Sequence, residues 1–285
     1  MAVVDRKRRG ADVDGADREL QQFDADQRVR AVDGTGASTT AAQKMVDEIK
    51  ALGGEAVADT NSVATPEGGA AIVQTALDTW GRVDIVINNA GILRDKAFHN
   101  MEPDLLNPVI DVHLKGAFYV TKPAFVKMRE QGYGRIISTS SAAGVFGNFG
   151  QTNYGAAKMG LVGLTRVLAV EGAKSNIKAN AIAPLALTRM TETIIGKMGT
   201  RLDPALVSPL VAYLASDECA VSGELYSVGG GRVARVFLGE CPGYFKADLS
   251  PEDVRDHLDT IRNTDGFSVP SNLSEETALF LPHFA

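Results

Sequence analysis

The sequence is poor in cysteine and has no long apolar run. Its two cysteines, Cys219 and Cys241, form neither a CxxC motif nor a disulfide framework, which favours a reducing compartment. No apolar run approaches the roughly 18 residues that a membrane span needs. The first residues also lack the apolar stretch of a signal peptide. We therefore predict a cytoplasmic protein without membrane association.

Positive charge is not in excess. The chain has 29 Lys and Arg residues against 35 Asp and Glu residues, which gives a net charge of −6 at pH 7. Such a chain offers no surplus of basic surface to a phosphate backbone, so we predict no nucleic-acid partner. The histidines also lack the spacing of metal ligands, so no metal site is predicted. They are His99, His113, His257 and His283.

From residue 39 onward, helix-like and strand-like segments alternate. Apolar spacing and helix-end signals predict helices over about 39–52, 66–80, 102–129 and 153–174. Short β-branched runs predict strands over 83–88, 135–138, 178–183 and 224–228. Strands separated by helices predict an α/β fold: one Rossmann-like domain with a doubly wound parallel sheet. Ligands of such a sheet bind at the carboxyl ends of its strands.

Two regions depart from this alternation. Residues 1–33 contain 15 charged residues and little apolar periodicity, which is typical of a segment with little to bury. From residue 236 the chain continues into a C-terminal extension, where a short helix is predicted over 253–262. The sequence is therefore divided into an atypical charged segment (1–33), a Rossmann-like domain (34–235) and the extension (236–285).

Tyr154 and Lys158 have the spacing of neighbours on one helix face. A positive charge beside a phenol favours the phenolate, which would bring the hydroxyl toward the range where it exchanges a proton with a carbinol or carbonyl oxygen. Ser141 lies just past the strand over 135–138, where a hydroxyl could donate to the same substrate oxygen. Ser138 and Ser140 are rivals for that role. Alone, the pair also fits an exposed helix surface, and the serines also fit an ordinary loop.

Several motifs occur in the order typical of one family. They are Asn88-Asn89-Ala90-Gly91, the set Ser141, Tyr154 and Lys158, and Asn180-Ala181-Ile182-Ala183-Pro184. In these motifs the chain resembles the short-chain dehydrogenase/reductase family. Over residues 37–235 it is most similar to the (3R)-hydroxyacyl-CoA dehydrogenase domain of multifunctional β-oxidation enzymes and their bacterial relatives. This closer resemblance rests on stretches such as Gly147-Asn148-Phe149-Gly150-Gln151-Thr152-Asn153-Tyr154.

The resemblance implies an oxidoreductase that moves a hydride between NAD, or NADP, and a 3-hydroxyacyl-CoA or related lipid alcohol. It implies Tyr154 as the acid/base, Lys158 as the group that lowers its pKa and holds the nicotinamide ribose, and Ser141 as the group that orients the substrate oxygen. His113 stands where the wider family has Asn and is assigned a supporting role. The resemblance also implies a homodimer or homotetramer. Further cofactor contacts are expected from Asn61, Ser62, Asn89, Ala90, Gly91 and Pro184.

The glycine-rich turn that should cradle the cofactor's pyrophosphate is missing. The only candidate, Thr35 to Ala42, has Thr40 and Ala42 where glycines belong. Asp33 could be the ribose-binding acid that ends a second strand. Three explanations compete for residues 1–33: a shifted reading frame, a natural loss of cofactor binding, and a divergent phosphate site. The alternative function is a cofactor-deficient family member that acts as an assembly or acyl-CoA-binding module.

Overall fold

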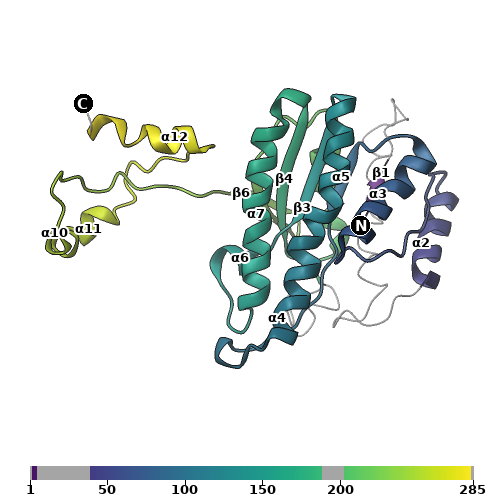
Figure 1. Ribbon diagram of the computed structural model, residues 1–285, viewed down its shortest axis with the longest axis horizontal. Coiled ribbons are helices and arrows are strands. Elements are labelled where there is room, and N and C mark those ends of the chain that lie inside the picture. Colours follow the sequence, from purple (N-terminus) through teal and green to yellow (C-terminus); the bar gives the residue numbers. More distant parts are fainter. Residues whose placement is uncertain (1, 5–38, 188–201, 284–285) are drawn as a thin grey trace. The chain divides into compact units, whose positions relative to one another are not determined.

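The structure, a computed structural model, describes residues 2–4, 39–187 and 202–283 (Figure 1). The chain divides into two compact units, residues 1–235 and 236–285. The predictions on Asp33 and on Thr35 to Ser38 lie outside the described residues. The strands of the first unit are β1 (Ala2–Val4), β2 (Ile85–Asn88), β3 (Gly134–Thr139), β4 (Ile177–Pro184) and β5 (Leu225–Gly229), with β6 (Arg232–Val236) at its end. Its helices are α2 (Thr39–Ala51), α3 (Pro66–Trp80), α4 (Pro103–Ile110), α5 (Gly116–Gln131), α6 (Ala142–Phe146), α7 (Thr152–Gly172) and α9 (Ser208–Ala215).

A single sheet organises the first unit. In the described residues it has six strands in the order β1-β2-β3-β4-β5-β6, and β2 to β5 run parallel to one another. The register places Val86 opposite Ile136, and Ile136 opposite Ala179. This arrangement confirms the predicted α/β fold with a parallel sheet.

The edge strand β1 is antiparallel to its neighbour β2. Ala2 pairs with Ile87 and Val4 with Ile85, so the chain leaves β1 at the amino end of β2. The carboxyl end of β1 therefore lies at the sheet edge opposite the carboxyl ends of β2, β3 and β4. In a dinucleotide-binding sheet the first strand would run parallel and deliver its turn to the carboxyl edge.

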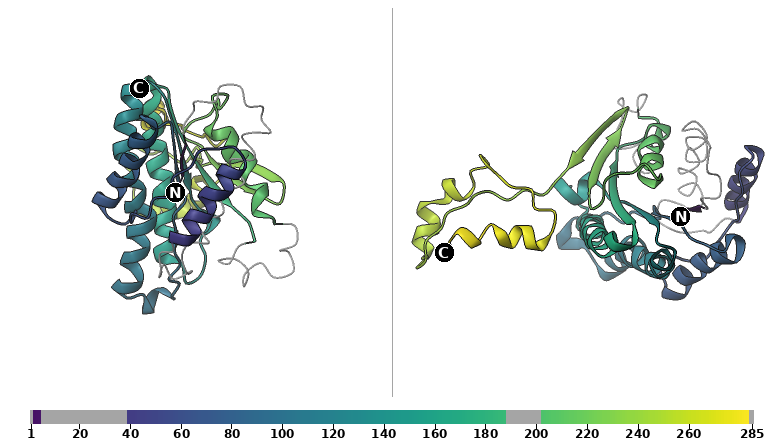
Figure 2. Two further views of the ribbon diagram at one scale, coloured as in Figure 1. Left: turned by 90° about the vertical axis from the view of Figure 1, so that its right-hand side faces the viewer. Right: turned by 90° about the horizontal axis from the view of Figure 1, so that it is seen from above.

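Helices cover both faces of the sheet because successive residues of a buried strand point to opposite sides. Val86 and Ile136 face a core formed with α3 and α5, whereas Ile87 and Ile137 face a core formed with α9. The view from above in Figure 2 shows the strands between these helix layers. The doubly wound arrangement predicted from the sequence is thus present.

The start and end of α3 follow directly from the sequence. The Thr65 side chain accepts a hydrogen bond from the Gly68 amide, Pro66 occupies the first turn, and Gly81 closes the helix with a φ of 74°. A threonine cap, an early proline and a left-handed glycine are standard start and stop signals. The predicted helix over 66–80 agrees with the observed bounds.

The long helix predicted over 102–129 is instead interrupted. It forms as α4 and α5, joined by a π-helical turn over Asp111–Lys115. Pro108 lies inside α4 and lacks the amide that continues the ordinary hydrogen-bond ladder. A π turn adds a residue to one turn and occurs frequently at functional sites. The sequence pattern could not show it because both halves keep helical apolar spacing.

Several elements of the structure were not predicted: β1, α6, α9, β6 and α12 (Leu273–Ala278). The helix α9 is eight residues long and apolar nearly throughout, so it lacks a clear amphipathic period. The strand β6 reads Arg-Val-Ala-Arg-Val and is half-buried or exposed along its length, as an edge strand can be. The sequence of α12 is polar and short.

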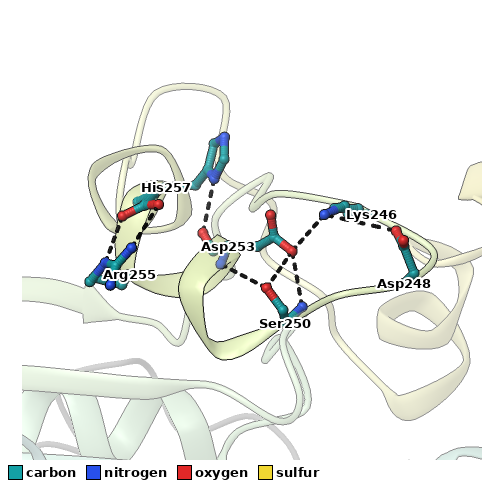
Figure 3. Close-up of polar contacts among 7 residues, drawn as sticks. Lys246, Asp248, Ser250, Asp253, Arg255 and His257 are labelled. Atoms are coloured by element: carbon teal, nitrogen blue, oxygen red, sulfur yellow. Dashed lines mark hydrogen bonds and ion pairs between the residues drawn. The ribbon is translucent and has the colours of Figure 1, made fainter.

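The second unit contains α10 (Pro251–Asp256), α11 (Leu258–Ile261) and α12. The helix predicted over 253–262 is therefore two short helices. His257 lies between them, as the last cap of α10 and the first cap of α11. Figure 3 shows the start of α10, where Ser250 and Asp253 form a reciprocal capping box and Lys246 binds the Asp253 carboxylate at 2.7 Å. All described side chains beyond residue 236 are half-buried or exposed. Within the described ranges, no helix is long and apolar enough to cross a bilayer.

Candidate active site

The site lies where three neighbouring parallel strands end. The segment Asn88–Gly91 follows β2, Ser141 follows β3, and Pro184 is the last residue of β4. Because these strands are parallel and adjacent, their carboxyl ends share one edge of the sheet. The helix α7 supplies Tyr154 and Lys158 in its first two turns.

Lys158 lies beneath the phenol of Tyr154. Its Nζ atom is 5.5 Å from the centroid of the Tyr154 ring and donates a hydrogen bond of 2.6 Å to the carbonyl oxygen of Thr139. Lys158 is only 3% exposed. The structure thus brings together the two side chains that the i, i+4 spacing placed on one helix face.

Of the three candidate serines, Ser141 contacts the phenol. The Ser141 side chain is the one that acts to lower the pKa of Tyr154, and its hydroxyl also caps α6 by accepting from the Ala143 amide at 3.2 Å. The Ser140 hydroxyl instead donates to the carbonyl oxygen of Lys158 at 2.7 Å, and Ser138 is fully buried in the sheet. Ser140 and Ser138 therefore serve the scaffold.

Burial controls the charge states of the pair. It raises the pKa of Tyr154 above its usual value, against the opposing effect of the Ser141 hydrogen bond. Burial also lowers the pKa of Lys158 from 10.5 to about 7. The lowering of the phenol's pKa by Lys158, expected from the resemblance, stays a prediction, because burial is the larger influence on Tyr154 in this structure.

His113 reaches the site from the π-helical turn. It is 3% exposed, and its ring meets the Tyr154 ring edge-on with the centroids 5.2 Å apart. Its Nε2 atom is 2.8 Å from the carbonyl oxygen of Ile92. Burial, together with the charge of Lys158, holds the pKa of His113 well below its usual value. The imidazole is therefore neutral at physiological pH.

Two buried amides that the sequence analysis did not single out hold the site together. Asn153 donates to the carbonyl oxygens of Arg94 and Leu105, each at 2.9 Å, and accepts from the Tyr154 amide at 2.7 Å. Gln151 donates to the Asp95 carboxylate at 2.7 Å. These bonds fasten the segment after β2 to the start of α7. Both amides lie in the stretch that carried the closer resemblance, which was the available signal.

The remaining predicted cofactor residues lie in loops at or near this edge. The Asn89 side chain accepts from the Thr139 hydroxyl at 2.9 Å. Asn61 is exposed, and its amide nitrogen donates to Asp59 at 3.0 Å. The Ser62 hydroxyl accepts from the Ala64 amide. Ala90, Gly91 and Pro184 are half-buried.

The two ends of a nicotinamide dinucleotide fit this chain differently. At the nicotinamide ribose end, the Lys158 ammonium has three protons, of which Thr139 takes one, so the observed donors suit a ribose hydroxyl. At the pyrophosphate end, the described residues form no glycine-rich turn, and β1 ends at the edge opposite the carboxyl ends of β2 to β4. Within the same residues, no group of three or more His, Cys, Asp or Glu side chains could hold a metal ion.

Comparison with known proteins agrees with this geometry. The sequence profile of the family described as short chain dehydrogenase matches residues 24–198. A short-chain type dehydrogenase/reductase of Mycobacterium tuberculosis is 51% identical over 226 residues, which cover 79% of each chain. An acetoacetyl-CoA reductase of an Acinetobacter species is 43% identical and covers 58% of this chain and 71% of that protein.

A solved structure is also similar. The full-length peroxisomal multifunctional enzyme type 2 of Drosophila melanogaster matches with a TM-score of 0.74 and 36% identity, over 85% of this chain and 43% of that one. The chain spans about half or less of the length of the peroxisomal multifunctional enzymes that it matches. The family profile, the bacterial relative and the shared fold lead to one conclusion. The chain belongs to the short-chain dehydrogenase family of oxidoreductases.

Proposed function

We propose that this protein is an NAD(P)-dependent dehydrogenase that interconverts a 3-hydroxyacyl-CoA and its 3-oxo counterpart, with Tyr154 as the acid/base. The observation that carries the proposal is the cluster at the strand ends: Ser141 after β3, and the Lys158 Nζ atom 5.5 Å from the centroid of the Tyr154 ring. Short-chain dehydrogenases in general use NAD or NADP, and the choice between them is open.

Tyr154 and Ser141 act on the substrate oxygen. When bound, the nicotinamide ring supplies or accepts the hydride. In the reduction, the protonated phenol donates its proton to the oxygen of the 3-oxo group, and the Ser141 hydroxyl stabilises the negative charge that develops there. In the oxidation, the same phenol oxygen takes the proton of the carbinol. Since burial raises the pKa of Tyr154, the oxidation is expected to accelerate with rising pH.

Lys158 and Asn153 keep the phenol in place. Lys158 stands over the phenol ring, anchored on Thr139, and is expected to hold the nicotinamide ribose. Asn153 accepts from the Tyr154 amide while its amide group ties down the facing loop. These side chains thus hold the phenol oxygen of Tyr154 in one position. A fixed position of the reacting groups favours a fast proton transfer.

The choice of an acyl-CoA substrate has two supports. Motifs of the sequence resemble those of (3R)-hydroxyacyl-CoA dehydrogenases, and one relative is named an acetoacetyl-CoA reductase. Apolar surface also lies next to the site: Phe146 and Phe149, in the segment between Ser141 and Tyr154, are 74% and 89% exposed. Exposed aromatic side chains beside a reaction centre suit a substrate with an apolar tail.

The test follows NADH formation from a 3-hydroxyacyl-CoA and compares Tyr154→Phe with the unchanged protein. Loss of the hydroxyl should lower the rate by at least about 100-fold, because the proton then lacks its donor and acceptor. A control variant, Tyr119→Phe on α5, should keep full activity. Equal rates for Tyr154→Phe and the unchanged protein would exclude the proposed mechanism.

A second candidate is a family member with a decayed cofactor site, acting as an assembly or acyl-CoA-binding module. The direction of β1 favours it, because this strand does not bring a phosphate-binding turn to the carboxyl edge. Calorimetric titration separates the candidates. Heat of binding on addition of NAD or NADP supports the enzyme, whereas no heat at millimolar cofactor, with a folded far-UV circular dichroism spectrum, supports the module.

A further inference from the structure

One buried side chain, His113, touches both the loop after β2 and the catalytic phenol. Its Nε2 atom lies 2.8 Å from the carbonyl oxygen and 3.0 Å from the amide nitrogen of Ile92. Its ring plane is perpendicular to that of Tyr154, at a centroid distance of 5.2 Å. The loop and the phenol belong to different elements, and the one imidazole ring contacts both. A shift of this ring would therefore affect both.

The same imidazole excludes a side chain at position 91. A Cβ atom on Gly91 would lie 2.5 Å from Cε1 and 3.3 Å from Nδ1 of His113. Carbon atoms in contact keep about 3.5–4.0 Å between them, so alanine at this position and the ring in its present place are incompatible. Gly91 is not among the glycines of positive φ in the described residues. The reason for glycine here is therefore the neighbouring ring and not the backbone conformation.

We propose that His113 is a positioning residue: its imidazole fixes the loop after β2, supports the edge of the Tyr154 ring, and makes glycine obligatory at position 91. The inference rests on the proposed function for its kinetic consequence. Its structural part, the steric coupling of positions 91 and 113, stands without any reaction.

The imidazole fulfils this role as a neutral ring. In either neutral tautomer Nε2 bonds to the Ile92 backbone: it accepts from the amide at 3.0 Å, or it donates to the carbonyl oxygen 2.8 Å away. Nδ1 has no hydrogen-bond partner in the part of the chain that the structure describes. The uncharged ring then supports the geometry without itself gaining or losing a proton in the reaction.

A stability cycle tests the coupling without cofactor or turnover. Thermal unfolding is compared for Gly91→Ala alone, and for Gly91→Ala combined with His113→Ala or with His113→Phe. We expect Gly91→Ala to lower the Tm or abolish soluble expression, His113→Ala to restore folding, and His113→Phe, which keeps a ring, to restore nothing. Gly163→Ala on α7 is the control, since its Cβ would meet nothing within 4 Å. An unchanged Tm for Gly91→Ala, or equal rescue by both double variants, overturns the proposal.

Kinetics distinguish positioning from proton relay. His113→Ala should lower kcat about 100-fold, the effect typical of a misplaced reacting group. His113→Phe should recover a measurable part of this loss, and the pH dependence of kcat should keep its shape in both variants. If His113→Phe is as slow as His113→Ala and one limb of the pH profile disappears, His113 relays protons and the positioning role is refuted. A failure of the proposed function is distinguishable from a failure of this inference: Tyr154→Phe would keep full activity, while the stability cycle would still give the expected result.

Discussion

Replacing Lys158 with methionine is expected to stabilise the protein below pH 7 while it abolishes the proposed reaction. In the folded chain burial lowers the pKa of Lys158 from 10.5 to about 7. That fall corresponds to about 5 kcal/mol of unfavourable free energy for keeping the ammonium charged in the folded state. Methionine has a similar length and no charge, so it removes this cost. The substitution also removes the hydrogen bond to Thr139. The loss of this bond costs about 1–3 kcal/mol and offsets part of the gain.

The sign of the effect depends on pH. Because the folded pKa is the lower one, the unfolded chain binds more protons between about pH 7 and 10.5, and the free energy of unfolding of the natural protein rises across this window. Below pH 7 the whole cost is present, and Lys158→Met should be more stable by about 2–4 kcal/mol. Above pH 10.5 only the lost hydrogen bond remains, and the variant should be less stable by about 1–3 kcal/mol.

Urea unfolding followed by far-UV circular dichroism, at several pH values from 6 to 10.5, measures this crossover. The matched control is Lys127→Met on α5, whose side chain is 44% exposed and which should show no crossover. Retained dehydrogenase activity in Lys158→Met would contradict the assigned role. A variant that is less stable at pH 6, or whose stability difference is constant with pH, would show that the buried ammonium carries no such cost.

Three further predictions concern other parts of the chain. Asn153→Ala should lower the free energy of unfolding by about 1–3 kcal/mol, because the carbonyl oxygens of Arg94 and Leu105 lose their donor; urea titration checks this, and an unchanged midpoint would refute it. Phe149→Ala should change the free energy of unfolding by no more than about 0.5 kcal/mol, but it should lower kcat/KM about tenfold for a ten-carbon acyl-CoA and little for a four-carbon one. Phe118→Ala on α5 is the control. An equal loss of kcat/KM for both substrates would contradict a contact between Phe149 and the acyl chain. Ser250→Ala should cost α10 about 1 kcal/mol. The cap itself should persist above about pH 4 and fail as the pH falls toward 2, because bonds from Lys246 and Ser250 lower the pKa of Asp253 to about 2; NMR of the α10 amides measures both, and a cap that survives at pH 2 would refute the assignment.

Much of the fold could be predicted because its signals are local. Thr65, Pro66 and Gly81 mark the ends of α3, and short β-branched runs mark β2 and β3. The meeting of Ser141 with Tyr154 also followed, since residues at adjacent parallel strand ends and on the next helix share one edge.

The rest depends on contacts that a linear pattern does not contain. The π turn at Asp111–Lys115 keeps ordinary helical spacing on both sides, so no period reveals it. The charge states of Tyr154 and Lys158 depend on how deeply they are buried, and the sequence shows only that they are neighbours. Asn153 looked like one polar residue among several, although the two carbonyl oxygens that it binds lie 59 and 48 positions away in the sequence.

The π turn between α4 and α5 also limits how this stretch can tolerate a change in length. An α-helix advances about 100° per residue, and the wide turn absorbs one residue beyond the regular count. Deleting a single residue there would restore a regular helix with both flanks near their present orientation, but it would redirect the side chains of the turn itself. The imidazole at 113 would then turn away from the phenol that it now meets edge-on. In this segment a one-residue deletion should therefore be more harmful than many substitutions.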